Sequence, residues 1–153
     1  MESKANLFQR LSRIMADVAF IGNEDKKVNG QYSYVGHNAV SQAVREAMIT
    51  HGVFSYIRVL ETAENGNCLS VKISMRFTNC DDPTEFIDAE SCGMGIDTSD
   101  KKAGKGLSYA VKLCLLKTFL IPTGDSSDDV ERDNIPFSTE PIESKPAKKK
   151  AWD

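Results

Sequence analysis

Apolar residues recur at helical spacing in three parts of the chain. Such spacing places them on one side of a helix. It predicts a helix over residues 7–21, stopped at Gly22, a second over residues 40–51 ended by Gly52, and a last over residues 107–118. The apolar positions are Leu7, Leu11, Ile14, Val18 and Ile21; Val40, Ala43, Val44, Ala47 and Met48; and Leu107, Ala110, Val111, Cys114 and Leu115.

Between the second and third helical segments the apolar pattern changes to the alternation of β-strands. It predicts strands over residues 53–62, 67–79 and 85–92, with a hairpin turn at Asn65-Gly66. Residues 93–104 are rich in glycine and lysine and predict a flexible loop. In the middle strand Leu69, Val71, Ile73, Met75 and Phe77 face one way, and Ser70, Lys72, Ser74, Arg76 and Thr78 face the other.

This order of elements predicts an α+β fold, in which helices pack on the apolar face of an antiparallel three-stranded meander. Residues 1–124 form this core domain and carry no net charge. The net charge of −3 arises in residues 125–153, which also hold three of the five prolines and few large apolar groups. That composition predicts a disordered acidic, proline-rich tail.

Composition narrows the class of protein. The chain has 153 residues, 41% of them hydrophobic, and no run approaches the ~18–20 apolar residues of a membrane span. The N-terminus lacks the apolar core of a signal peptide. The cysteines, Cys68, Cys80, Cys92 and Cys114, form neither a C-x-x-C pair nor a dense framework. We therefore expect a reduced, cytoplasmic protein.

A cluster of cations and hydroxyls surrounds the start of the last helix. Helical spacing places its later members on one face, and a helix N-terminus adds free N–H donors and partial positive charge. This combination is typical of a surface that binds a phosphate backbone, although a solvated lysine face gives the same pattern. The chain does not match a nucleotide-binding P-loop. That motif requires glycine at position 99 and serine or threonine at position 106, where the chain has Ser99 and Gly106. The candidate residues are Lys101, Lys102, Lys105, Ser108, Tyr109 and Lys112.

Two further pairs of residues are candidates for DNA contact. Lys72 and Arg76 share one face of the middle strand, where they form either an ordinary solvent face or a second track for phosphates beside the basic helix. Tyr32 and Tyr34 lie in a basic loop. There each of them either stacks on bases or covers the edge of the core, and we expect the second role for one of them.

The third strand and the turn before it carry acidic residues, and carboxylates of this kind hold metal ions in nucleases. No lysine nearby completes a nuclease-like signature, and Asp81-Asp82-Pro83 is typical of a turn. His37 and His51 lack ligand partners at metal-binding spacing, so we expect capping or surface roles and no metal or other cofactor. The acidic residues are Asp81, Asp82, Glu85, Asp88 and Glu90.

Three stretches of the chain, taken in order, resemble the ERF family of bacteriophage single-strand annealing proteins. The first runs from Tyr32-Ser33-Tyr34-Val35 to His51-Gly52-Val53, and the second is the strand-rich middle. The third runs from the Gly104-Lys105-Gly106 segment to Gly124-Asp125, so the resemblance spans about residues 7–125. At residues 36–38 the chain has Gly-His-Asn, where the family pattern often has an acidic residue.

The resemblance implies an ATP-independent protein of phage recombination that binds single-stranded DNA and pairs it with a complementary strand. It also implies a β-β-β-α core, similar to that of ring-forming annealing proteins, and a homo-oligomeric ring or filament. Such a protein performs no covalent catalysis and would act in the cytoplasm of an infected bacterium.

Two alternative functions of the core stay open. The helix-β-β-β-helix order also resembles a double-stranded-RNA-binding domain, which reads the shape of A-form RNA. A metal-dependent nuclease on the acidic cluster is a third possibility.

In the tail, acidic residues followed by Ile-Pro-Phe at residues 133–137 (Asp133 to Phe137) resemble the C-terminal tip of bacterial single-stranded-DNA-binding proteins. This segment would contact a host single-strand-binding or repair protein, or the basic surface of its own core.

Overall fold

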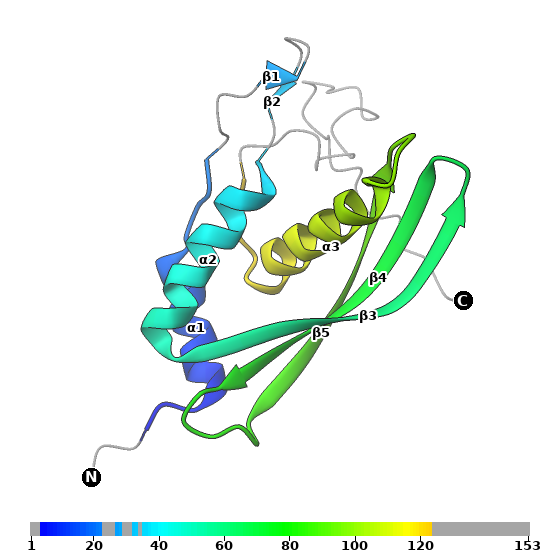
Figure 1. Ribbon diagram of the computed structural model, residues 1–153. Coiled ribbons are helices and arrows are strands. Elements are labelled where there is room, and N and C mark those ends of the chain that lie inside the picture. Colours follow the sequence, from blue (N-terminus) through cyan, green and yellow to red (C-terminus); the bar gives the residue numbers. More distant parts are fainter. Residues whose placement is uncertain (1–3, 23–26, 29–31, 34, 124–153) are drawn as a thin grey trace, which may run out of the picture.

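The computed structural model describes residues 4–22, residues 35–123 and, for the backbone alone, residues 27–28 and 32–33. These residues form helices, a two-stranded hairpin and a three-stranded sheet (Figure 1). The helices are α1 (Leu7–Asp17), α2 (His37–His51) and α3 (Lys102–Thr118). The strands are β1 (Lys27–Val28), β2 (Tyr32–Ser33), β3 (Val53–Asn65), β4 (Cys68–Asn79) and β5 (Phe86–Ile96).

The three long strands form one antiparallel sheet in the order β3-β4-β5, so β3 and β5 are its edges. The turn between β3 and β4 contains Gly66, whose φ of 57° lies in the left-handed region that glycine adopts readily. In the turn before β5, Asp82 accepts hydrogen bonds from the backbone N–H and the hydroxyl of Thr84 at 3.0 and 2.6 Å. These hairpins confirm the predicted meander and the α+β class.

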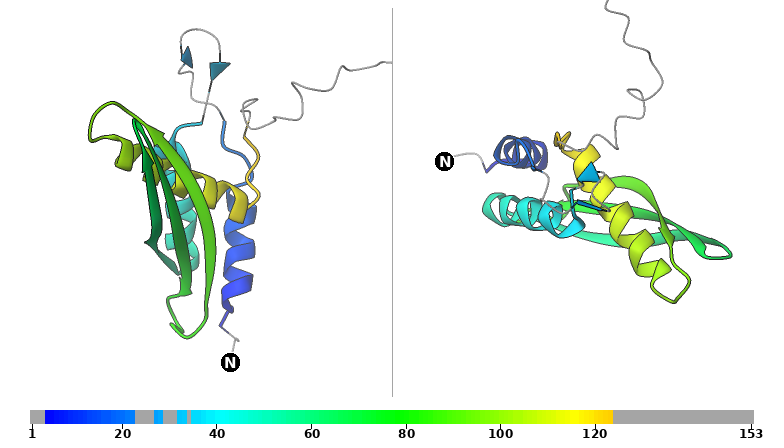
Figure 2. Two further views of the ribbon diagram at one scale, coloured as in Figure 1. Left: turned by 90° about the vertical axis from the view of Figure 1, so that its right-hand side faces the viewer. Right: turned by 90° about the horizontal axis from the view of Figure 1, so that it is seen from above.

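All three helices lie on the same side of this sheet. α3 packs across β5 and β4, α2 packs against α3 and the start of β3, and α1 packs against α2. In side view the sheet and α1 lie at opposite edges of the molecule, with α2 between them and α3 running obliquely from the sheet edge toward α1 (Figure 2). No described element covers the other face of the sheet, which we call the open face.

The side of β4 that faces the helices forms the centre of the core. Val71, Ile73, Met75 and Phe77 are buried there, which confirms the alternation predicted for this strand. The ring of Phe77 meets that of Phe119 edge to face, with centroids 5.5 Å apart. The core therefore joins the middle strand directly to the end of α3.

The first helix is shorter than predicted. It ends at Asp17, and Val18 is its C-terminal cap. Val18 and Ile21 are still buried, but beyond the helix, and Ile21 forms a parallel bridge with Thr123. The prediction of a helix to Ile21 was wrong because an apolar residue at helical spacing can be buried equally well by a strand-like segment.

The predicted flexible loop at residues 93–104 is largely regular structure. β5 continues to Ile96 and α3 begins at Lys102, so only residues 97–101 connect them. Gly93 and Gly95 lie in β5 where the backbone of α3 crosses it. A Cβ atom on Gly95 would overlap the carbonyl oxygen of Lys102, and one on Gly93 would overlap that of Gly106. These glycines allow close helix–strand packing and are not signs of a loop.

Candidate nucleic-acid interface

The predicted basic face of α3 exists and points away from the sheet. Gly106, Ala110 and Cys114 are buried against the strands, so the first half of the helix turns its opposite side outward, whereas Leu115 and Leu116 are buried in its second half. Lys101 and Lys105 are exposed there, and Tyr109 is 41% exposed. Ser108 and Lys112 are half-buried on the same side. We call Lys101, Lys105, Ser108, Tyr109 and Lys112 the outer face of α3.

Carboxylates neutralise some of the lysines around α3. Lys105 pairs with Asp97 at 2.5 Å, and Lys102 leaves the outer face to pair with Glu64 at the end of β3. Lys112 instead donates to the carbonyl oxygen of Val35 at 3.3 Å and lies 5.0 Å from the ring centroid of Tyr109. Within the described residues, no carboxylate lies within 4.0 Å of Lys101 or Lys112. Lys101 is thus an exposed cation with no acidic neighbour among the described residues, whereas Lys112 is half-buried and held by Val35 and Tyr109.

Asp97 holds the start of α3 in place. One of its oxygens accepts hydrogen bonds from the N–H and hydroxyl of Ser99, and the other contacts Lys105. The hydrogen bond from Lys105, followed by those from Ser99, holds the pKa of the Asp97 carboxyl well below its usual value. A lowered pKa in the folded state stabilises the fold above the unfolded pKa of about 3.9, and this contribution fades as the pH falls below it.

Lys72 and Arg76 lie on the open face, on the opposite side of the sheet from α3. The prediction that they adjoin the basic helix was wrong, because β4 presents its even-numbered residues away from the helices. Lys72 pairs with Glu90 at 3.1 Å, and Arg76 forms two 2.7 Å hydrogen bonds with Asp88. Both cations are thus already neutralised, and their contact with DNA stays a prediction.

The open face also carries exposed aromatic rings that the sequence analysis did not single out. Phe54 on β3 and Phe86 on β5 flank Thr78 of β4 in register, and they are 59% and 45% exposed. The guanidinium of Arg76 lies 3.8 Å from the ring centroid of Phe86. Cross-strand register with Thr78 places both rings on the open face, where exposed large apolar residues are typical of an interface.

A groove lies between α2, β3 and α3, beside the outer face of α3. Its volume is about 480 Å³, and its floor is apolar. Ser108 from α3 and Arg45 from α2 line it, and so does Ser55 from β3, whose buried hydroxyl has no hydrogen-bond partner within the described residues. Sequence analysis missed the groove because its lining residues come from four separate elements, α2, β3, β4 and α3. We call this the α2–α3 groove; its remaining lining residues are His37, Ser41, Val44, Met48, Tyr56, Ile57, Met75, Leu107, Val111 and Leu115.

The comparisons with known proteins agree with the resemblance found in the sequence. The family model of the ERF superfamily matches residues 7–152. The chain belongs to the ERF superfamily. This membership associates it with DNA recombination and strand annealing in phages, and therefore with DNA as a partner. No curated protein gave a significant match.

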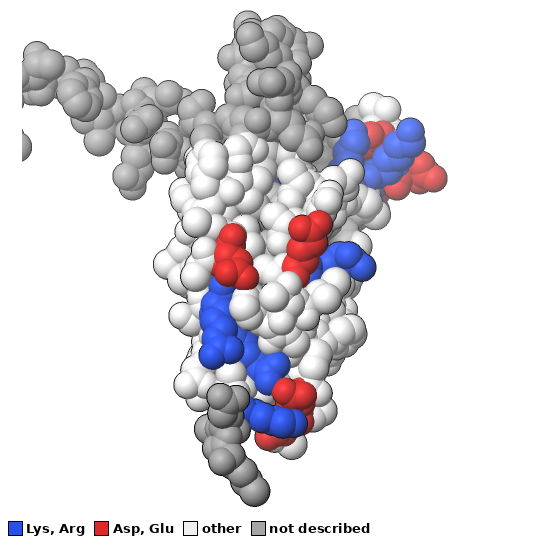
Figure 3. Space-filling view, turned by 90° about the vertical axis from the view of Figure 1, so that its left-hand side faces the viewer, with Lys and Arg blue, Asp and Glu red and all other residues white. Residues whose placement is uncertain are grey.

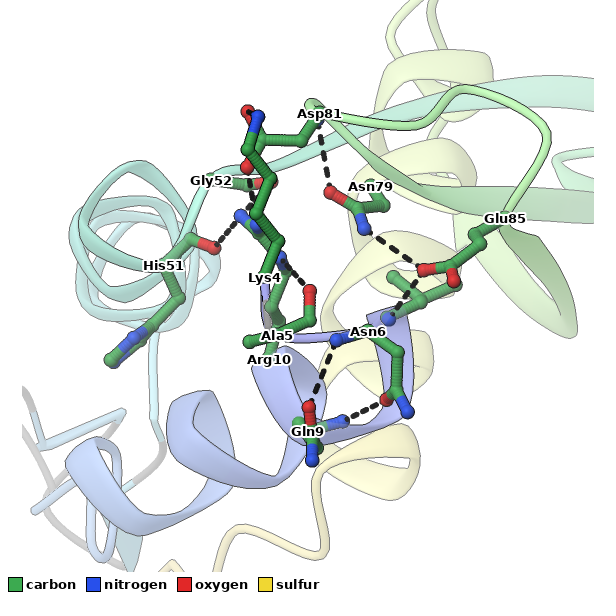
Figure 4. A network of polar contacts seen from close by, with 11 residues as sticks. Lys4, Ala5, Asn6, Gln9, Arg10, His51, Gly52, Asn79, Asp81 and Glu85 are labelled. Atoms are coloured by element: carbon green, nitrogen blue, oxygen red, sulfur yellow. Dashed lines mark hydrogen bonds and ion pairs between the residues drawn. The ribbon is translucent and has the colours of Figure 1, made fainter. Parts of the chain in front are cut away.

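In this ERF superfamily protein, the acidic residues proposed for a nuclease have structural partners. Asp81 accepts a hydrogen bond from Arg10 at 2.5 Å (Figure 4). Glu85 accepts from the N–H of Leu7 at the start of α1, at 2.7 Å, and from Asn79 at 2.9 Å. Across residues 4–22 and 35–123, no three His, Cys, Asp or Glu side chains are grouped to hold a metal ion.

The two histidines also contact neighbouring side chains. His51 lies 2.6 Å from Asp17, which ties the end of α2 to the end of α1, and His37 lies 3.4 Å from the hydroxyl of Ser41. On the side of the molecule shown in Figure 3, Lys and Arg side chains lie next to Asp and Glu side chains. The described part of that side therefore shows no broad basic surface for a nucleic acid.

Several predicted contacts of this ERF superfamily protein fall where the structure gives no side chains. Tyr32 lies in β2, which pairs with β1 through Val28, and only its backbone is described. Tyr34 and the tail segment Asp133–Phe137 lie outside the described residues. Among the described helices, none is long and apolar enough to cross a membrane.

Proposed function

We propose that this chain binds single-stranded DNA along the outer face of α3 and anneals it to a complementary strand in phage homologous recombination. The observation that supports the proposal is that Lys101 and Lys112 lie on one side of α3 and that, among the described residues, neither has a carboxylate within 4.0 Å. Membership of the ERF superfamily supports DNA as the partner of the chain, and we assign the DNA to this basic face. The reaction needs no ATP, no cofactor and no covalent catalysis.

The mechanism follows from the charge of the DNA. Lysines along α3 neutralise phosphates and release counterions, which lowers the repulsion between two strands. The first N–H groups of α3, near Lys101, add hydrogen-bond donors for a phosphate oxygen. If the backbone is held and the bases point outward, a second strand can test pairing. Base pairing then supplies the driving force.

We further propose that the chain forms a homo-oligomer through its sheet. β3 and β5 are 13 and 11 residues long, and both are edges of the three-stranded sheet. Unpaired edges of this length pair readily with another chain. Joining β3 of one subunit to β5 of the next gives a head-to-tail assembly that closes into a ring or continues as a filament.

Replacing Lys101 and Lys112 together by alanine should weaken the binding of single-stranded DNA and flatten its salt dependence. Each lost phosphate contact lowers the slope of log K against log salt concentration by about 0.7, so the double variant should lose about 1.4. Fluorescence anisotropy with a labelled oligonucleotide, measured across a salt series, gives this slope. Circular dichroism checks that the variant is folded.

Lys117→Ala is the matched control, because Lys117 is an exposed cation in the last turn of the same helix but outside the outer face. It should leave the slope unchanged. Lys72→Ala, measured in the same series, decides whether the open face also contacts phosphate. An unchanged slope in the folded Lys101/Lys112 variant would show that these lysines form a solvated face.

One observation favours a second candidate, a double-stranded-RNA-binding module. The order α2-β3-β4-β5-α3, with both helices on one side of the sheet, is the order expected of such a domain. α1 and the β1–β2 hairpin have no role in that interpretation. Competition between single-stranded DNA and duplex RNA separates the two functions, and the mass in solution separates an oligomer from a 16.9 kDa monomer.

A further inference from the structure

The α2–α3 groove has the chemistry of a site that anchors an apolar peptide segment. Val44, Ile57, Met75 and Leu115 line it with apolar surface, and its size suits a large side chain or two. An apolar side chain that enters the groove would remove this surface from water, which is favourable.

The positive charge around this groove favours an acidic partner. Arg45 lines it from α2, and Lys112 follows the lining residue Ser108 by one turn of α3. Neither cation has a carboxylate within 4.0 Å in the described part of the chain, and none of the residues that line the groove is acidic. An occupant with apolar side chains next to carboxylates therefore fits the groove better than a neutral or basic one.

The chain contains one segment of this composition beyond its last described residue. Ile135-Pro136-Phe137 follows an acidic run made of Asp128, Asp129, Glu131 and Asp133. Phe137 lies 14 residues after Thr123, a distance of about 46 Å when the chain is extended. That reach exceeds the diameter expected for a domain of ~120 residues, whose radius of gyration is about 14 Å. The segment can thus reach the groove of its own chain.

We propose that Ile135-Pro136-Phe137 docks in the α2–α3 groove of its own chain, with the preceding acidic residues along Arg45 and Lys112. The tether keeps the segment at high effective concentration, so modest intrinsic affinity is enough. Docking places carboxylates beside the outer face of α3 and makes the tail a competitor of single-stranded DNA. The docking itself is independent of the proposed function, and only the competition rests on it.

Tryptophan fluorescence tests the docking without DNA. Trp152 is the only tryptophan of the chain, so the full-length variant Phe137→Trp with Trp152→Phe carries a single reporter at the anchor position. We expect a blue-shifted emission, because the indole enters an apolar groove, whereas the native chain with Trp152 should emit as an exposed indole. An emission at the position of a fully hydrated indole overturns the proposal.

A pair of charge reversals tests the place of docking. Arg45→Glu, added to the reporter chain, should return the emission to that of an exposed indole. Arg13→Glu reverses the same charge at an exposed position of α1 away from the groove and should leave the blue shift unchanged. A blue shift that survives Arg45→Glu, or one that disappears on dilution, assigns the tryptophan to another surface or another copy and overturns the proposal.

Adding single-stranded DNA to the reporter chain tests the competition. We expect the emission to shift to the red as a labelled oligonucleotide binds, and Phe137→Ala to bind DNA more tightly at low salt. If a tenth of the molecules are undocked, removal of the anchor raises the apparent affinity about tenfold. DNA that binds without moving the emission overturns the competition alone. If no DNA binds even to Phe137→Ala, the proposed function fails while the docking stands.

Discussion

Replacing Gly95 by alanine is expected to destabilise the fold by about 3 kcal/mol or more, at the upper end of what overpacking costs. The added Cβ would overlap the carbonyl oxygen of Lys102 and approach the backbone nitrogen of Gly106 at 2.6 Å. Both atoms belong to a helix backbone, so no flexible side chain can move aside. The helix would have to shift from β5, and with it the outer face of α3. Urea unfolding followed by circular dichroism measures the loss.

Gly104→Ala is the matched control for this substitution. Gly104 lies in α3 only two residues before Gly106, but no atom lies within 4 Å of a Cβ built on it. Alanine favours the helix over glycine, so this variant should gain about 0.4–1 kcal/mol. Equal effects of the two substitutions would contradict the close packing of α3 on β5.

Replacing Arg10 by alanine is expected to cost about 3 kcal/mol of the free energy of unfolding. Arg10 is 8% exposed, and its guanidinium joins three separate parts of the chain. It donates to the carbonyl oxygens of Ala5 and His51 at 2.9 and 2.8 Å, and it pairs with Asp81 after β4. Breaking a buried ion pair costs ~3–5 kcal/mol. We expect a cost at the lower end of this range, because the Asp81 side chain is 44% exposed and water can hydrate it when Arg10 is absent.

Arg13→Ala is the control for Arg10, because Arg13 lies one turn further along α1 with its side chain exposed. A surface substitution of this kind changes stability by no more than about 0.5 kcal/mol. Arg10→Lys should recover only part of the loss, since a lysine cannot reach several acceptors at once with a planar fork. If alanine at both positions gave the same unfolding midpoint, the network of Figure 4 would be irrelevant to stability.

Local sequence patterns were sufficient to predict much of the fold. Alternation along β4 identified its buried side, Asn65-Gly66 located the hairpin, and Gly52 marked the end of α2, where its φ is 65°. The residues of the outer face of α3 were also predictable, because helical spacing alone decides which of them share a side. In each case the signal and the structure it predicts lie within a few residues of one another.

The features of the fold and the candidate site that local patterns did not predict depend on contacts between residues far apart in the sequence. Gly93 and Gly95 were interpreted as loop residues, because a glycine that admits a neighbouring helix looks the same in sequence as a flexible one. The ion pair of Lys102 with Glu64 and the hydrogen bond of Arg10 with Asp81 join residues that lie 38 and 71 positions apart. No local pattern shows which lysines a carboxylate has neutralised, so the difference between Lys101 and Lys105 emerged only from the structure.

The annealing of complementary oligonucleotides tests the central claim most directly. A fluorophore on one strand and a quencher on the other report pairing in the presence of EDTA and without ATP. We predict that the full chain accelerates quenching, that Lys117→Ala does the same, and that the Lys101→Ala and Lys112→Ala double variant is slower. Quenching no faster than in the protein-free mixture, or acceleration that requires ATP or a divalent metal, would contradict the account.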